Sequence, residues 1–151
     1  MNKKNLARAA AAAAISGLCA LSVASPAQAF SASSTMTSGG LTYKAYAESC
    51  NLYWNSCSWY TNGSLSASRT FTHTSDVKAN GIGVTINIST KEAGVSISGN
   101  STSMAHAVER GYGTYSSTAG VASPSIFSVS VAARSKMATS VNYVQTGWTT
   151  W

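Results

Sequence analysis

The segment IGVTINIS at residues 82–89 alternates strictly between large apolar and small or polar side chains. Val and Ile occupy the even positions, and Gly, Thr, Asn and Ser occupy the odd ones. A period of two predicts a β-strand with one buried and one solvated face. A polar stretch ending in Gly94 follows, and the alternation then resumes at Val95. We therefore expect residues 82–89 and 95–100 to form a hairpin with a loop over 90–94.

The same alternation recurs along the rest of the chain, at residues 41–47, 65–71, 104–108, 127–133 and 139–143. The last two segments predict a second hairpin with its turn at 134–136. Between the strands, we expect a turn at 76–81 and a loose Ser/Thr/Gly stretch from 111 to 124. Beyond residue 29, Ser, Thr, Val, Ile and Tyr dominate over strong helix formers. The sequence therefore predicts an all-β fold, an antiparallel β-sandwich or small barrel of about 7–8 short strands.

The N-terminus has the three parts of a secretory signal peptide. Lys3, Lys4 and Arg8 supply positive charge, residues 9–23 are apolar, and Ala27-Gln28-Ala29 has the small-x-small cleavage pattern. The apolar stretch is shorter than the roughly 20 residues of a membrane span. We expect a Sec-type signal peptide over 1–29, cleaved after Ala29, in a secreted bacterial protein.

Cleavage would leave a flexible Ser/Thr/Gly-rich segment at 30–40 and a β domain over 41–151. The net charge of the whole chain is +6. Seven basic and four acidic residues lie beyond residue 29, which leaves +3. Such scattered charge does not indicate a nucleic-acid partner, which calls for a dense basic patch. It is compatible with solubility alone, or with weak attraction to an anionic wall or membrane surface. The part beyond residue 29 contains no second apolar stretch long enough for an integral membrane span.

Cys50 and Cys57 are the two cysteines beyond residue 29. In an exported protein such a pair predicts a disulfide, which stabilises by about 2–3 kcal/mol in the loop-entropy model. Two cysteines without a neighbouring His or Cys do not supply the four ligands of a structural zinc site. We therefore expect no metal and no cofactor.

Aromatic and Asn residues are dense around this disulfide. Aromatic faces stack on sugar rings and amides bond sugar hydroxyls, while Tyr and Trp also anchor protein–protein contacts. The alternative, that the rings fill the core, stays open at this point. The candidate binding residues are Tyr53, Trp54, Asn55, Trp59 and Tyr60.

No catalytic residues are predicted. A glycosidase needs two carboxylates facing one cleft, and acidic residues are few. The Gly-x-Ser-x-Gly elbow of serine hydrolases is absent from the sequence. His73 and His106 continue the alternation of apolar neighbours, so we interpret both as half-buried strand residues.

The sequence thus favours a secreted, non-enzymatic β domain that binds a cell-wall glycan, another polysaccharide or a surface protein. A bacteriocin-like toxin or enzyme inhibitor, and a self-assembling surface protein, are the alternatives; a small hydrolase is a weaker one. Residues 128–148 resemble the closing hairpin of lactococcin-type bacteriocins, mostly in their strand pattern. Oligomeric state is not predicted.

Overall fold

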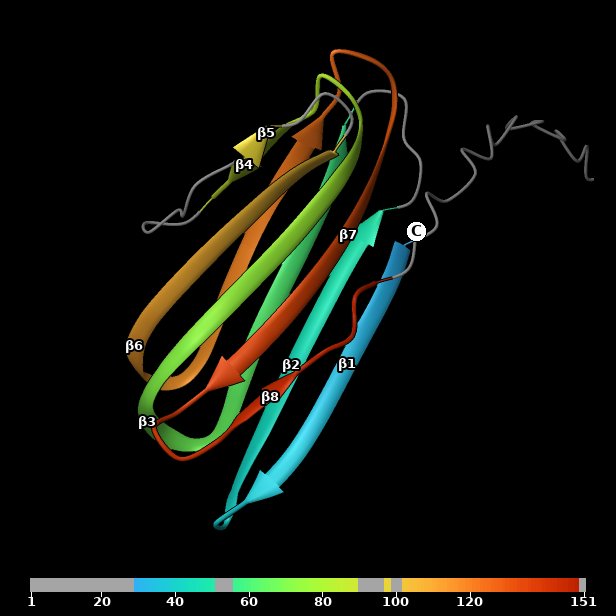
Figure 1. Ribbon diagram of the computed structural model, residues 1–151. Coiled ribbons are helices and arrows are strands. Elements are labelled where there is room, and N and C mark those ends of the chain that lie inside the picture. The colour runs from blue at the N-terminus through green and yellow to red at the C-terminus, as the bar shows by residue number, and fades with distance from the viewer. Residues whose placement is uncertain (1–28, 51–55, 90–96, 99–101, 150–151) are drawn as a thin grey trace, which may run out of the picture.

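The computed structural model describes residues 29–50, 56–89, 97–98 and 102–149, and within them it contains strands and no helix (Figure 1). Every strand pair is antiparallel, which confirms the predicted all-β antiparallel class. No helix in these ranges is long and apolar enough to cross a membrane. The expected signal peptide, residues 1–29, lies outside the described residues apart from Ala29. The strands are β1 (Ala29–Ser38), β2 (Leu41–Cys50), β3 (Cys57–Ile82), β4 (Thr85–Ile88), β5 (Ile97–Ser98), β6 (Thr102–Ser123), β7 (Ile126–Ala138) and β8 (Tyr143–Gln145).

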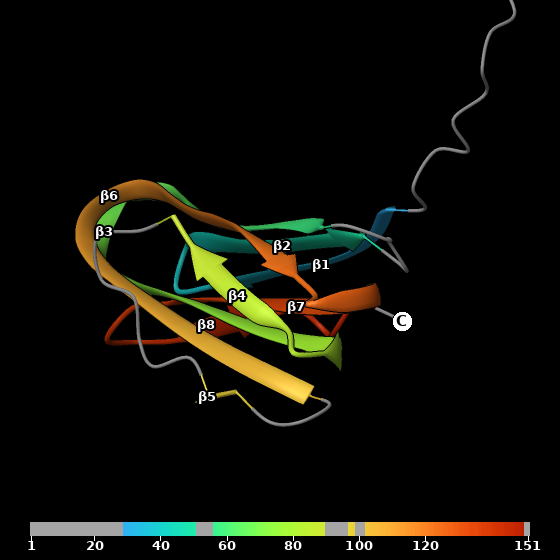
Figure 2. The same ribbon diagram turned by 90° about the horizontal axis from the view of Figure 1, so that it is seen from above.

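The eight strands form one sheet that bends into two layers, because β3 and β6 are long enough to run through both (Figure 2). The start of β3 pairs with β2 and with the end of β6. The rest of β3 pairs with β7 and with the start of β6. The β3–β6 register shifts between Ser64 and Arg69, where both strands turn from one layer to the other.

We call the half with β1, β2 and β4 the upper layer and the half with β5, β7 and β8 the lower layer. The strand path of the sheet ends on β1 at one side and on β4 at the other. Among the residues that the structure describes, the sheet is therefore not closed into a barrel.

The predicted hairpin over 82–100 is wrong in its pairing. β4 pairs with Gly120–Ser123, and β5 pairs with Ser103 and Met104, so the two strands lie on opposite ends of β6. β6 presents one edge in each layer, and β4 takes the upper edge, where Val84 and Ile86 are buried. The expected loop, 90–94, lies outside the described residues.

The second predicted hairpin is correct only in part, because β7 and β8 pair antiparallel but β8 contains only Tyr143 of the expected strand 139–143. Its turn lies later than expected, at 139–142, where the Thr139 N–H donates to the Asn142 carbonyl at 2.9 Å. The expected turn at 134–136 is instead strand. There Ser135 and Met137 point inward, so the alternation of β7 continues through these polar residues.

Two segments expected as turn or loop are also strand. β3 continues through 76–81, because Val77 and Ala79 are buried and paired on both sides. β6 continues through 111–123, because Ser116 and Thr118 point inward and are buried. Three of these inward residues, Ala79, Ser116 and Thr118, have small or hydroxyl side chains that a hydrophobicity pattern does not mark as core.

The segment 30–40, expected to be flexible, is mostly strand. β1 pairs with β2 along its whole length, from Ala29 opposite Cys50 to Ser38 opposite Leu41. Gly39 and Gly40 form the two-residue connection with φ of 58° and 75°. Positive φ at both positions is what a type I′ hairpin turn requires, and glycine adopts it without steric cost.

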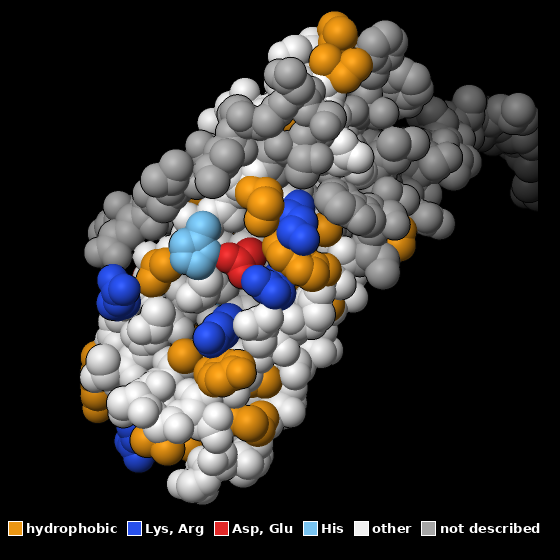
Figure 3. Space-filling view, in the orientation of Figure 1, with side chains coloured by type: hydrophobic (Ala, Val, Ile, Leu, Met, Phe, Trp, Pro, Cys, Tyr) orange, Lys and Arg blue, Asp and Glu red, His pale blue; other side chains and the backbone are white. Residues whose placement is uncertain are grey.

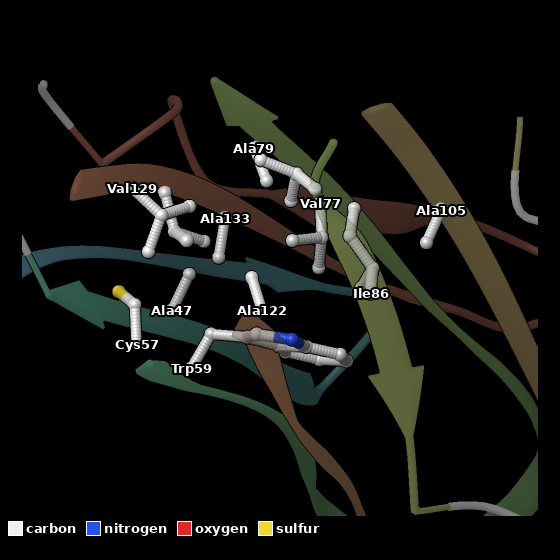
Figure 4. Packing of buried hydrophobic residues seen from close by; sticks show 12 residues of the cluster. Ala47, Cys57, Trp59, Val77, Ala79, Ile86, Ala105, Ala122, Val129 and Ala133 are labelled. Carbon is white, nitrogen blue, oxygen red and sulfur yellow. The ribbon is translucent and has the colours of Figure 1, made fainter. Parts of the chain in front are cut away.

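The core between the layers is built from small side chains around a few large ones. At the disulfide end, the Trp59 ring packs among alanines and valines of both layers (Figure 4). Near the bend, Tyr43, Phe71 and Met137 form a second cluster. Buried hydroxyls pair with one another, as Thr61 with Ser75 at 2.6 Å and Ser49 with Thr149 at 2.6 Å. This pairing lets Ser and Thr occupy interior positions without losing hydrogen bonds.

Candidate functional site

The predicted binding residues separate into three groups. Tyr53, Trp54 and Asn55 lie outside the described residues. Trp59 is 2% exposed and belongs to the core, so its ring is not presented at the surface. Tyr60, the next residue along the strand, points outward from the upper layer. The predicted Cys50–Cys57 disulfide is confirmed, and with Cα atoms 5.6 Å apart it joins the end of β2 to the start of β3.

Tyr60 lies within a group of outward side chains on the upper layer. In β2 and in this half of β3 the odd-numbered residues are buried, so the even-numbered ones face solvent. Cross-strand register places Tyr46 opposite Asn62, Glu48 opposite Tyr60, and Asn62 opposite Ser117 of β6. We call this group the tyrosine face: Tyr46, Glu48, Tyr60, Asn62, Tyr115 and Ser117.

Hydrogen bonds connect the rings of the tyrosine face. The Tyr46 hydroxyl donates to Glu48 Oε2 at 2.8 Å, and the Tyr60 and Tyr115 hydroxyls share a hydrogen bond. The bond to Glu48, with partial burial, raises the pKa of Tyr46 above its usual value. The bond to Tyr60 raises the pKa of Tyr115. Burial alone would raise the pKa of Tyr60, but its bonds with Tyr115, Asn62 and Ser117 outweigh burial and lower it. Either of the two hydroxyls can donate in this bond.

A hollow on the same layer adjoins this face. Ser64, which lines it, stands directly opposite Tyr115 in the β3–β6 register. Hydroxyl groups and the Lys44 ammonium supply its polar contacts. Its lining is Thr42, Lys44, Ser64, Leu65 and Ser66.

His73, expected to be half-buried, is fully buried between the layers. Its Nδ1 lies 2.9 Å from Ser116 Oγ and its Nε2 lies 3.1 Å from Ser135 Oγ. Ser116 donates onward to Glu109 at 2.7 Å, and Ser135 donates to the Asn62 carbonyl at 2.7 Å. Burial lowers the pKa of His73 to about 4, and the nearby Glu109 carboxylate opposes this shift only in part. The ring is therefore neutral at pH 7.

This arrangement does not have the geometry of a catalytic triad. In a triad the carboxylate holds the histidine and the serine faces the substrate. Here Glu109 binds Ser116 instead of the ring, and both serines that contact His73 are buried. The His73 ring and both serines are enclosed between the two layers.

The second histidine, expected to be half-buried, is exposed on the outside of the lower layer. His106 Nδ1 lies 2.6 Å from Asp76 Oδ1, and Arg134 donates to Asp76 Oδ2 through Nε at 3.0 Å and Nη2 at 2.6 Å. Sequence reasoning missed this cluster because it placed Asp76 in a turn. The even numbering of all three residues was the available signal, since it puts them on one face of paired strands.

Within the described ranges, no group of three or more His, Cys, Asp or Glu side chains could hold a metal ion. Comparison of the chain with protein-family models, with curated proteins and with solved structures finds no significant match.

Proposed function

We propose that this chain is an exported, non-enzymatic β domain that binds a glycan of the cell envelope or its surroundings through the tyrosine face. The observation that carries the proposal is the position of Tyr46, Tyr60 and Tyr115. They lie on one outward face across three adjacent strands, beside amide, carboxylate and hydroxyl groups. The two-layer sheet, which we interpret as a sandwich, serves as the rigid scaffold.

The chemistry of this face favours a sugar over an apolar partner. A sugar ring presents C–H groups on its faces and hydroxyls on its edges. Tyrosine rings can stack on the C–H faces of the sugar. Asn62, Glu48 and Ser117 can form hydrogen bonds with its hydroxyls. Protein interfaces more often have an apolar centre. The outward positions around these tyrosines carry mostly Ser, Thr, Asn, Lys and Glu, and the two small apolar residues Ala119 and Val121 lie beside them on β6. Polar groups therefore predominate on the described part of this layer.

Two features support export. The first 29 residues have the pattern of a cleavable signal peptide. The disulfide is typical of proteins that fold in oxidising surroundings. Cleavage after Ala29 would leave the β1–β2 register intact from Phe30 onward.

We expect Tyr60→Ala to weaken retention of the protein on its glycan about tenfold, because it removes one stacking ring and the hydrogen-bond partner of the Tyr115 hydroxyl. The measurement is co-sedimentation of the purified protein with insoluble bacterial cell walls, cellulose and chitin. Trp54→Ala, tested in parallel, addresses the part of the predicted site that the structure does not describe.

Tyr112→Ala is the matched control, because Tyr112 is 76% exposed and lies at the bend, away from the tyrosine face. It should be retained like the unmodified protein. If no polymer retains the protein, or if Tyr112→Ala loses as much binding as Tyr60→Ala, the glycan proposal fails.

A second candidate function, self-assembly at a surface, is favoured by the edge strand β1. Its ten residues pair with β2 on one side, and on the other side no strand among the described residues pairs with it. The strand AFSASSTMTS has no charged residue and no proline. Native proteins usually guard such an edge with Lys, Pro or a bulge. A second copy of this chain could add its own β1 there.

We expect Ser33→Lys to convert assemblies of this protein into monomers, because it places a charge on the exposed side of β1. Sedimentation velocity over a range of concentrations is the measurement. Thr114→Lys adds the same charge at the exposed bend and should leave assembly unchanged. A protein that stays monomeric at every concentration would rule out this candidate.

A further inference from the structure

The outer face of the lower layer concentrates the positive charge of the protein. Lys78, Arg110, Arg134 and Lys136 all lie there, which is four of the seven basic residues beyond residue 29. The one described acidic side chain among them is Asp76, next to the exposed histidine (Figure 3). We call these residues, with His106, Tyr143 and Trp148, the basic face. In the upper layer, by contrast, β2 carries one Lys and one Glu.

The strand register explains why these charges gather. Asp76 of β3 stands opposite His106 on one side and opposite Arg134 on the other. Two residues from Asp76 along β3, Thr74 stands opposite Lys136, and four residues from it Thr72 stands opposite Arg110. A face built from three paired strands therefore collects every second residue of each.

Asp76 neutralises only one of these cations. Both of its oxygens are occupied, by Arg134 and by His106. Among the described residues no ion pair involves Lys78, Arg110 or Lys136. Their positive charge is therefore available to an external anion.

Two aromatic rings hold the cationic side chains along the surface. Lys78 Nζ lies 4.2 Å from the Trp148 ring centroid, with the Arg134 guanidinium 4.6 Å from the same centroid. Lys136 Nζ lies 4.2 Å from the Tyr143 ring centroid. Cation–π contacts of this kind orient a charge without neutralising it.

Exposed apolar side chains lie among and beside these charges. Met104 is 46% exposed and stands opposite Lys78, and Ile82, at the end of β3, is 50% exposed. The space-filling view shows apolar side chains among the basic ones on this side of the molecule (Figure 3). A soluble polyanion would contact only the cationic side chains and would leave the apolar side chains exposed to water.

We propose that the basic face docks on the surface of an anionic phospholipid bilayer. Lys and Arg side chains each contribute about 1 kcal/mol near such a surface, Tyr and Trp favour the headgroup region, and Met and Ile reach toward the acyl chains. These groups lie on one face of three paired strands, which allows them to contact the bilayer together. This docking is independent of the tyrosine face, which lies on the opposite layer.

The test is co-sedimentation of the purified protein, its N-terminus defined by mass spectrometry, with vesicles. Vesicles of phosphatidylglycerol and phosphatidylcholine should retain it at low salt, and pure phosphatidylcholine vesicles should not. The double variant Lys78→Gln/Lys136→Gln should bind the anionic vesicles about 30-fold more weakly. Lys44→Gln, which removes a charge from the opposite layer, should change binding less than about twofold.

A further variant separates a bilayer from a soluble anionic polymer. Met104→Ser keeps every charge and should still weaken vesicle binding several-fold. Absence of binding to anionic vesicles, equal losses in Lys44→Gln and the double variant, or an unchanged affinity in Met104→Ser would each overturn the proposal. Circular dichroism and thermal unfolding of every variant would show that the fold is retained.

Discussion

Gly120→Ala is expected to destabilise the protein by about 3 kcal/mol, because the β6 backbone at this position touches both β4 and the core. A Cβ at residue 120 would overlap the Asn87 carbonyl oxygen and lie 2.6 Å from Trp59 Cε2. The first neighbour is backbone in a paired strand, and the second is a ring held among alanines and valines. The Asn87 carbonyl cannot move without disturbing the pairing of β4 with β6, and the Trp59 ring cannot move without disturbing the core.

Urea unfolding followed by tryptophan fluorescence measures this effect. A loss of this size would lower the Tm by about 10 °C. Gly147→Ala is the matched control, because nothing lies within 4 Å of the added Cβ there. It should change the free energy of unfolding by less than about 0.5 kcal/mol. If Gly120→Ala is as stable as the control, the close approach of β6 to Trp59 is wrong.

Acidification is expected to remove on the order of 3 kcal/mol of stability between pH 6.5 and pH 4 through the single buried residue His73. Burial lowers the pKa of His73 in the folded state to about 4, whereas the value in the unfolded chain is 6.5. Between these two values the unfolded state binds the proton and the folded state does not. The free energy of unfolding therefore falls as the pH drops through this window, and His73 contributes no pH dependence above it.

The measurement is urea unfolding at pH 7, 6, 5 and 4 for the unmodified protein and for His73→Gln. The variant loses packing and hydrogen bonds at pH 7, but it cannot gain a proton. The stability difference between the two proteins should therefore shrink by about 3 kcal/mol on going to pH 4. His106→Gln, at the exposed histidine, should keep the acid-sensitive profile. Parallel curves for the unmodified protein and His73→Gln would contradict the burial of a neutral ring.

Only some residues of the tyrosine face could be selected from the sequence pattern. The density of aromatic residues near the disulfide selected Tyr60, which belongs to this face. It also selected Trp59, which one step along the same strand points into the core. Tyr46 and Tyr115 could not be joined to Tyr60 from the sequence, because Tyr115 lies 55 positions away and meets it only through the β3–β6 pairing.

The sequence by itself determined the all-β class, the Cys50–Cys57 disulfide and the β2 strand, because alternating polarity and cysteine pairing are local signals. The tertiary structure alone decided which strands pair and where they end. β3 and β6 run through both layers, and their Ser, Thr and His side chains are buried because they find hydrogen-bond partners on distant strands. A pattern of hydrophobicity marks such residues as solvated. Hydrogen bonds with residues far away in the chain allow these side chains to be buried. Only the folded structure shows which residues form those hydrogen bonds.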